Sequence, residues 1–191
     1  MVTSDHTRPL PSKLTLPYIL KELHQGNPST EITILVATGL HHAPTPEEMI
    51  AKFGADVVEQ ENFVIHKADD YSTLVHLEDL PSGAPFWVNR LAVEADLLIA
   101  EGFIEPHFFA GYSGGRKSIM PGISGRDTIL VNHSADFIDH PNTQSGIIGG
   151  NIFNNDMEDA AGQAGLRFIL NVTLDEHKNI IGAFAGHPIE P

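Results

Sequence analysis

The chain has 191 residues, no cysteine, and 11 basic against 25 acidic side chains, which gives a net charge of −14. This charge disfavours nucleic acids and anionic membranes as partners, and the absence of cysteine excludes disulfide bonds and thiolate metal ligands. There is no apolar run of about 18 residues to predict a membrane span, and no secretion signal at the N-terminus. We therefore expect a cytoplasmic protein, with residues 1–191 forming a single domain.

The predicted elements alternate between helices and strands. In chain order they are a helix at 14–25, a strand at 32–37, a helix at 46–53, strands at 62–66, 72–77 and 86–88, a helix at 89–95, a strand at 97–100, helices at 128–138 and 152–164, and strands at 166–172 and 180–184. Short β-branched apolar runs indicate the strands, and Thr45-Pro46 followed by two glutamates indicates a helix start. This alternation predicts an α/β fold with a mainly parallel, Rossmann-like sheet and helices on both faces.

Three polar clusters follow predicted strands or the first few residues. They are Asp5 to Pro9, Thr38 to His42, and a long loop that starts at Gly102. Ligands of parallel α/β sheets bind beyond the carboxyl ends of the strands. We therefore expect these three loops to meet at one site.

The loop at 105–124 is rich in glycine and contains His107, Arg116 and Lys117. Glycines at 111, 114, 115 and 122 allow sharp bends and close approach of a ligand to the backbone. Arg116 occupies the position that glycine takes before the lysine of a P-loop, so a nucleotide triphosphatase is disfavoured. The loop is typical of a reaction site for an anionic, phosphorylated molecule, and the alternative is a solvated connection.

Two histidines of these loops, His41 and His107, suit paired proton transfer, because inversion of a stereocentre needs a proton acceptor on each face of the substrate. His42 is either a partner of that pair or simply exposed.

Lys117 suits a phosphate counter-ion, a Schiff-base nucleophile or a covalent cofactor anchor. His133 is a metal ligand, a helix-face residue or a core histidine, and Arg8 either clamps an anion or forms a surface ion pair. No H-x-x-x-H or H-E-x-x-H spacing supports a zinc hydrolase.

Four segments resemble the lactate racemases that depend on the nickel-pincer nucleotide cofactor. They are residues 4–9, residues 37–41, residues 105–122, and Asn132-His133. Their order is similar to the N-terminal catalytic half of that family, and the glycine–lysine segment is the most specific of the four. The resemblance implies an isomerase that racemises or epimerises lactate-like 2-hydroxy acids, with cofactor biosynthesis proteins among its partners.

The resemblance also implies roles for individual residues. Lys117 corresponds to the lysine that binds the cofactor, Ni(II)-pyridinium-3,5-bisthiocarboxylic acid mononucleotide, covalently through a thioamide, and His133 to the nickel ligand. His41 and His107 correspond to the two proton donor–acceptors. The segment formed by Asp5, His6, Thr7 and Arg8 corresponds to part of the cofactor pocket, with Arg8 near the substrate. In the family's chemistry, hydride leaves the substrate carbon for the cofactor and returns to either face of a planar 2-oxo acid.

The chain also departs from the family pattern. Family members are about twice as long and have a C-terminal domain that closes over the site, so we expect this chain to be an inactive or partial fragment. His42-Ala43 stands where a basic residue is expected after His41, which leaves the substrate open. The alternative function is a non-catalytic module that binds a phosphate or nucleotide cofactor.

Overall fold

The computed structural model describes residues 1–188, and its main sheet has the strand order β10-β9-β6-β1-β2-β3. The strands are β1 (Val2–Ser4), β2 (Thr33–Ala37), β3 (Asn62–Ile65), β6 (Leu98–Phe103), β9 (Leu166–Leu174) and β10 (Ile180–Gly186). Neighbouring strands are parallel except β9 and β10, which pair antiparallel. The prediction of a mainly parallel α/β sheet is confirmed.

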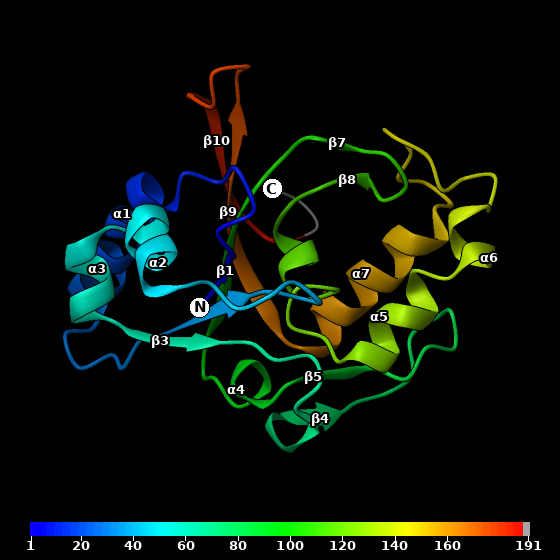
Figure 1. The fold of residues 1–191 in the computed structure, drawn as a ribbon, viewed down its shortest axis with the longest axis horizontal. Coiled ribbons are helices and arrows are strands. Elements are labelled where there is room, and N and C mark those ends of the chain that lie inside the picture. The colour runs from blue at the N-terminus through cyan, green and yellow to red at the C-terminus, as the bar shows by residue number, and fades with distance from the viewer. Residues whose placement is uncertain (189–191) are drawn as a thin grey trace.

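Helices cover both faces of this sheet (Figure 1). Helices α1 (Ser12–Gly26), α2 (Pro46–Phe53) and α3 (Ala55–Gln60) lie on one side, and α5 (Arg126–Asn132) and α7 (Ile152–Gln163) lie on the other. The alternation of side chains along β2 explains the two cores. Ile34 and Val36 belong to the core of α1 and α2, whereas Leu35 and Ala37 belong to the larger core that includes α7.

The remaining elements lie outside the main sheet. They are the antiparallel pair β4 (Leu74–His76) and β5 (Trp87–Asn89), the short pair β7 (Pro106–His107) and β8 (Gly111–Tyr112), the 3-10 helices η1 (Tyr71–Thr73) and η2 (Gly115–Ser118), and the short helices α4 (Arg90–Val93) and α6 (Ala135–Ile138). Among residues 1–188, no helix is both long and apolar enough to cross a bilayer.

Several predicted boundaries differ from the structure. The single helix predicted at 128–138 is wrong, because the backbone leaves the helical conformation at His133 and Ser134 and two short helices form instead. β1 and α3 were not expected, and the strand predicted at 97–100 continues to Phe103. The predicted helix start at Thr45 is confirmed: Thr45 and Glu48 bond reciprocally through side chain and backbone.

The strand order places a topological switch point between β1 and β6. From β1 the chain moves to β2 and β3 on one side, and it then crosses to β6 and β9 on the other. Loops that leave the carboxyl ends of β1 and β6 therefore diverge and leave a crevice, the usual ligand position in open α/β sheets. Residues 189–191, the end of the predicted domain, lie outside the described residues.

Candidate active site

A pocket of about 370 Å³ lies at the carboxyl ends of β1, β2 and β6. All three of the expected polar loops contribute to its lining, which includes Arg8, His41, His107, Phe109, Lys117 and His133. A cavity of this size is in the range of small-molecule sites. The structure therefore brings together five of the residues singled out from the sequence: Arg8, His41, His107, Lys117 and His133.

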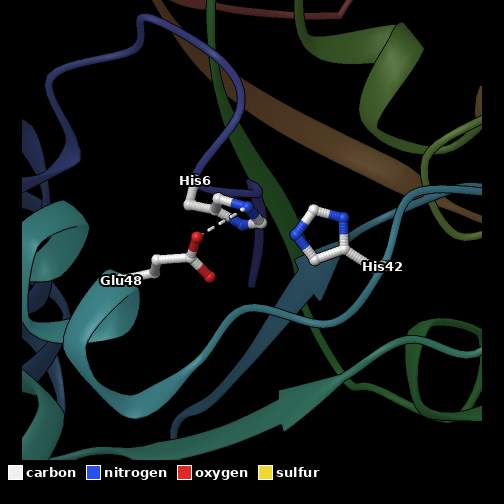
Figure 2. Close-up of side chains that lie close together, drawn as sticks. All are labelled: His6, His42 and Glu48. Carbon is white, nitrogen blue, oxygen red and sulfur yellow. Dashed lines mark ion pairs between the residues drawn. The ribbon is translucent and has the colours of Figure 1, made fainter.

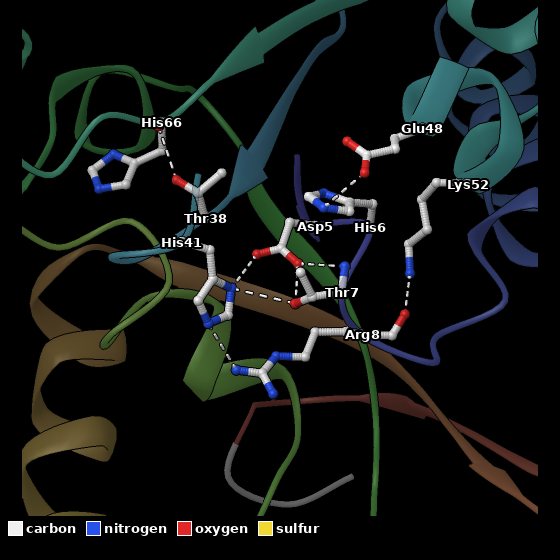
Figure 3. Close-up of polar contacts among 9 residues, drawn as sticks. All are labelled: Asp5, His6, Thr7, Arg8, Thr38, His41, Glu48, Lys52 and His66. Atoms are coloured by element: carbon white, nitrogen blue, oxygen red, sulfur yellow. Dashed lines mark hydrogen bonds and ion pairs between the residues drawn. The ribbon is translucent and has the colours of Figure 1, made fainter. Parts of the chain in front are cut away.

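Asp5 orients His41 across the gap between the ends of β1 and β2 (Figure 3). The Asp5 side chain is buried, and its Oδ2 lies 2.6 Å from Nδ1 of His41. Its Oδ1 accepts hydrogen bonds from the backbone N–H and the hydroxyl of Thr7, at 2.8 and 2.6 Å. Burial raises the pKa of Asp5, but the bonds from Thr7 and His41 outweigh this effect and lower it, so the carboxylate is ionised.

These bonds determine the tautomer of His41. An ionised carboxylate only accepts hydrogen bonds, so Nδ1 of His41 carries the proton and donates to Asp5. Nη2 of Arg8 lies 3.3 Å from Nε2 of His41, and a guanidinium only donates. Nε2 is therefore an acceptor, and its lone pair faces the guanidinium of Arg8.

Lys52 of α2 holds the segment that carries Arg8. Its Nζ donates to the carbonyl oxygens of Arg8 and Leu10, at 2.8 and 2.7 Å. Burial lowers the pKa of Lys52 to about 8, while the carboxylates of Glu101 and Asp5 act in the opposite direction. Lys52 thus ties the loop after β1 to the helix beside it.

His107 has the complementary tautomer. Its Nδ1 accepts the backbone N–H of Ala110 at 3.2 Å, so the proton of the neutral ring sits on Nε2. Burial lowers the pKa of His107 to about 4, and the positive charges of Lys117 and Arg8 act in the same direction. The ring stacks on Phe108, with 4.7 Å between centroids. At neutral pH His107 is therefore an uncharged hydrogen-bond donor.

Lys117 belongs to η2, and its amine lies 5.9 Å from the centre of the Phe109 ring. Burial, together with the nearby charges of Arg8 and Arg116 and against the effect of Glu105, lowers the pKa of Lys117 to about 7. Within residues 1–188, Lys117 forms no ion pair with a carboxylate. A large fraction of this amine is uncharged at neutral pH, which is the nucleophilic form.

His133 lies at the C-terminal end of α5, where the helix breaks. Its Nδ1 donates to the carbonyl oxygen of Ile129 at 3.0 Å, which leaves Nε2 with a free lone pair. Burial lowers the pKa of His133 to about 4, against the opposing effect of the Ile129 bond. A neutral imidazole fixed through one nitrogen by a backbone carbonyl is a common arrangement of metal-bound histidine.

The glycines of the loop have two different functions. Gly114 lines the pocket with φ +132°, a conformation that other residues rarely adopt. Gly122 also lines the pocket, but a Cβ there would lie 2.3 Å from the carbonyl oxygen of Ser118. The interpretation that glycine makes room for a ligand therefore needs correction at Gly122, where glycine makes room for the loop's own backbone.

Unpartnered polar atoms surround this crevice. Ser4 Oγ, in the pocket lining, is buried without a hydrogen-bond partner among the described residues. Arg116 Nη2 and Asn171 Oδ1 also lack partners, and both side chains flank Gly114. Buried polar groups are normally satisfied, and of these atoms Ser4 Oγ belongs to the pocket lining, where a polar ligand would give it a partner. With the guanidinium groups of Arg8 in the lining and Arg116 nearby, the site suits an anionic cofactor that also bears a metal for His133.

Three of the predicted cofactor-binding residues, Asp5, His6 and Thr7, do not line the pocket. Thr7 contacts Asp5 behind His41, and His6 lies near Glu48 and His42 in a separate cluster. Their assignment to cofactor binding stays a prediction. Ser4 and Phe109 lie in segments that were singled out from the sequence, but neither was given a role of its own. Asn171 was missed, because it belongs to β9 and comes beside Gly114 only in the fold.

Comparison with known proteins identifies the family. A family model described as the lactate racemase N-terminal domain matches residues 1–146. The chain belongs to this family. The family resemblance found in the sequence is therefore confirmed.

Two lactate racemases are similar to nearly the whole chain. The protein from Thermoanaerobacterium thermosaccharolyticum is 52% identical over 98% of the chain, and that from Lactiplantibacillus plantarum is 50% identical over 97%. The chain spans 44% of the length of each. It therefore corresponds to less than half of these relatives.

Solved structures give the same result. The lactate racemase apoprotein from T. thermosaccharolyticum superposes with a TM-score of 0.96 at 52% identity, over 98% of this chain and 45% of that one. A Thermotoga maritima protein superposes with a TM-score of 0.80 at 24% identity, over 96% of this chain and 48% of that one. The second similarity shows the fold alone.

Proposed function

We propose that this chain supplies the catalytic groups of a racemase for lactate or a related 2-hydroxy acid, working with a nickel-pincer nucleotide. The observation that carries the proposal is that His41 and His107, from the loops after β2 and β6, line one pocket, and that their hydrogen bonds favour complementary tautomers. Membership of the lactate racemase N-terminal family supports the same reaction class.

The two histidines divide the proton chemistry. Nε2 of His41 accepts the substrate's hydroxyl proton, and the ionised Asp5 stabilises the imidazolium that forms. Nε2–H of His107 donates to the substrate oxygen on the other side. For the opposite enantiomer the roles exchange: the proton of the neutral His107 ring moves to Nδ1, which releases the bond from Ala110, and the freed Nε2 lone pair accepts the hydroxyl proton.

Arg8 is the candidate partner of the substrate carboxylate. Without substrate, Nη2 of its guanidinium donates to the lone pair on Nε2 of His41, at 3.3 Å. A carboxylate attracts a guanidinium more strongly than a neutral imidazole does. Substrate binding would therefore draw Arg8 away and free His41 to act as a base.

The residues present suit the cofactor that the family resemblance implies. When bound, the cofactor supplies a site that takes hydride from the substrate carbon and returns it. Lys117 would hold it covalently through its uncharged amine, and Nε2 of His133 would bind the nickel. Cofactor biosynthesis proteins are accordingly proposed as partners of the whole protein.

An exposed aromatic side chain at the pocket suggests a further partner. Phe108 lines the pocket and stacks on His107, yet it is 77% exposed. Because the relatives are more than twice as long as this chain, we propose that their additional domain covers this ring and excludes water from the reaction.

The test compares the full-length protein with its His41→Asn and His107→Asn variants, each produced together with the cofactor biosynthesis proteins. General acid–base groups contribute about 10²–10⁴-fold to rate, so each variant should racemise lactate at least about 100-fold more slowly while it retains nickel. His24→Asn, at an exposed pair with Glu61, is the control and should have wild-type activity. Unchanged racemisation in the two site variants would contradict the roles of these histidines, and wild-type protein that retains the cofactor without racemising lactate would leave the cofactor-binding module as the better description.

A further inference from the structure

Two histidines and a glutamate meet where the loops after β1 and β2 approach the start of α2 (Figure 2). His6 follows β1, His42 follows β2, and Glu48 lies in the first turn of α2. Each offers one ligand atom, and these atoms all lie within 4.8 Å of one another. None of the three residues lines the pocket, so the cluster is distinct from the proposed cofactor site.

The spacing of the cluster is close to that of a metal site. Nε2 of His6 and Oε1 of Glu48 are 3.5 Å apart. Zinc bonds of about 2.0–2.2 Å in a tetrahedron place neighbouring ligand atoms about 3.3 Å apart, so this pair is already at the required separation. His42 is exposed, and a movement on the order of 1.5 Å would bring its ring to the same distance.

His6 lacks the partners that a buried imidazole normally has. Its side chain is only 13% exposed, and its Nδ1 has no hydrogen-bond partner among residues 1–188. Its Nε2 is too far from Glu48 for a good hydrogen bond. A cation bound beside Glu48 would give Nε2 of His6 the partner that it lacks and would leave the ring proton on Nδ1.

Glu48 is already oriented for this role. Its Oε2 accepts the backbone N–H of Thr45 at 2.8 Å, and its other oxygen faces His6. Such a second bond fixes the carboxylate, as outer partners of metal ligands generally do. The cap of α2 therefore holds one ligand in place before any ion arrives.

We propose that His6, His42 and Glu48 form a second metal site, for a borderline divalent ion of the zinc class. Two imidazoles and one carboxylate favour such ions over Mg²⁺, which prefers oxygen ligands, and leave further positions to water. The net charge of −14 favours cation binding in general. Because His6 follows Asp5 and His42 follows His41, the ion would link the two loops on both sides of the 2.6 Å Asp5–His41 contact.

The experiment is a calorimetric titration of the chelator-treated chain with Zn²⁺, with Mg²⁺ as a second probe. One zinc ion per chain should bind, and Mg²⁺ should not compete at equal concentration. Loss of outer partners alone costs about 10–100-fold in metal affinity, so loss of a ligand in His42→Ala should cost at least about 100-fold. His24→Ala is the matched control, because His24 also lies 3.3 Å from a carboxylate but has no third ligand, and it should bind zinc like the wild type.

Two further variants distinguish zinc binding at this cluster from zinc binding in the cofactor pocket. Glu48→Gln keeps a side-chain acceptor for the cap but removes the charge, so it should bind zinc more weakly with an unchanged melting temperature in chelator. His133→Ala alters the cofactor pocket and should leave zinc affinity unchanged. Equal affinity in the wild type and His42→Ala, or loss of binding only in His133→Ala, would overturn the assignment.

Discussion

Asp5 and His41 form a 2.6 Å contact that joins the loops after β1 and β2, and it fixes which nitrogen of His41 faces the pocket. The buried carboxylate of Asp5 accepts a hydrogen bond from Nδ1–H of His41, so the lone pair of His41 is on Nε2. Asp5 is thus a positioning residue that acts through His41.

Replacement of Asp5 by Asn should reduce racemisation strongly with little loss of nickel. The amide can donate to Nδ1 and so favours the wrong tautomer of His41, and it no longer stabilises an imidazolium. We expect the turnover number to fall by about 100-fold or more, with a smaller change in KM, measured by chiral chromatography of lactate on the cofactor-loaded full-length protein.

Asp69→Asn is the control for this change, because Asp69 pairs with Arg126 at the exposed surface away from the pocket. A tautomer role also predicts an altered pH profile of the turnover number, which a purely structural loss would not produce. Equal turnover numbers for Asp5→Asn and Asp69→Asn would contradict the positioning role.

Lys117 should react selectively with amine reagents near neutral pH. Burial lowers its pKa to about 7, so its uncharged fraction rises as the pH increases through this value. We expect acetic anhydride, used in limiting amount at about pH 7.5, to acetylate Lys117 ahead of the exposed Lys13, measured by peptide mass spectrometry. Acetylation of Lys117 that stays low until about pH 10 would show that the pocket does not lower its pKa.

Nickel retention should depend on both Lys117 and His133. In full-length protein produced with the cofactor biosynthesis proteins, we expect Lys117→Ala to lose the covalent mass increase and the nickel. His133→Ala should keep the mass increase of the organic part while the nickel content falls. Intact-protein mass spectrometry and elemental analysis give the two readouts, and full nickel retention with full activity in Lys117→Ala would refute the role assigned to this lysine.

Glu101 should contribute to the stability of the folded chain, although it lies close to the site. It is buried in β6, where its two oxygens accept hydrogen bonds from Thr3 at 2.6 Å and Thr15 at 2.5 Å. Glu101→Gln replaces one acceptor by a donor and leaves a buried hydroxyl without its partner. We expect the free energy of unfolding to fall by about 1–3 kcal/mol in urea titrations.

Glu94→Gln provides the comparison, because Glu94 pairs with Arg90 at 3.8 Å on the exposed surface. Its unfolding free energy should change by no more than about 0.5 kcal/mol. Similar values for the two glutamine variants would mean that the hydrogen bonds of Glu101 contribute little.

The parallel sheet could be predicted from the sequence because its strands are short apolar runs between helices, and such runs are visible in the local sequence. The same pattern predicted the site loops, because two of them follow predicted strands and the third follows the first few residues of the chain. Sequence analysis missed β1, whose three residues are too few for a pattern. It also ended the strand of β6 before Glu101, because the hydroxyl groups that bind this carboxylate are 98 and 86 residues away along the chain.

The helix predicted at 128–138 shows a different limit. Residues on either side of His133 have helical character, and propensity alone gives no reason for a break there. In the structure the chain turns at His133 and Ser134, and this turn leaves the His133 ring beside Phe109 and Phe153. Tertiary packing decides the orientation of this side chain, and a sequence pattern does not contain that information.

The walls of the pocket come from residues as distant in the chain as Ser4 and His133. No short peptide excised from the chain can carry this cavity, since the nucleophilic amine, its cationic neighbours and the imidazoles converge only after the strands have assembled. Any modification that requires the lowered basicity of Lys117 would therefore mark molecules that have finished folding, and it would pass over nascent or damaged ones.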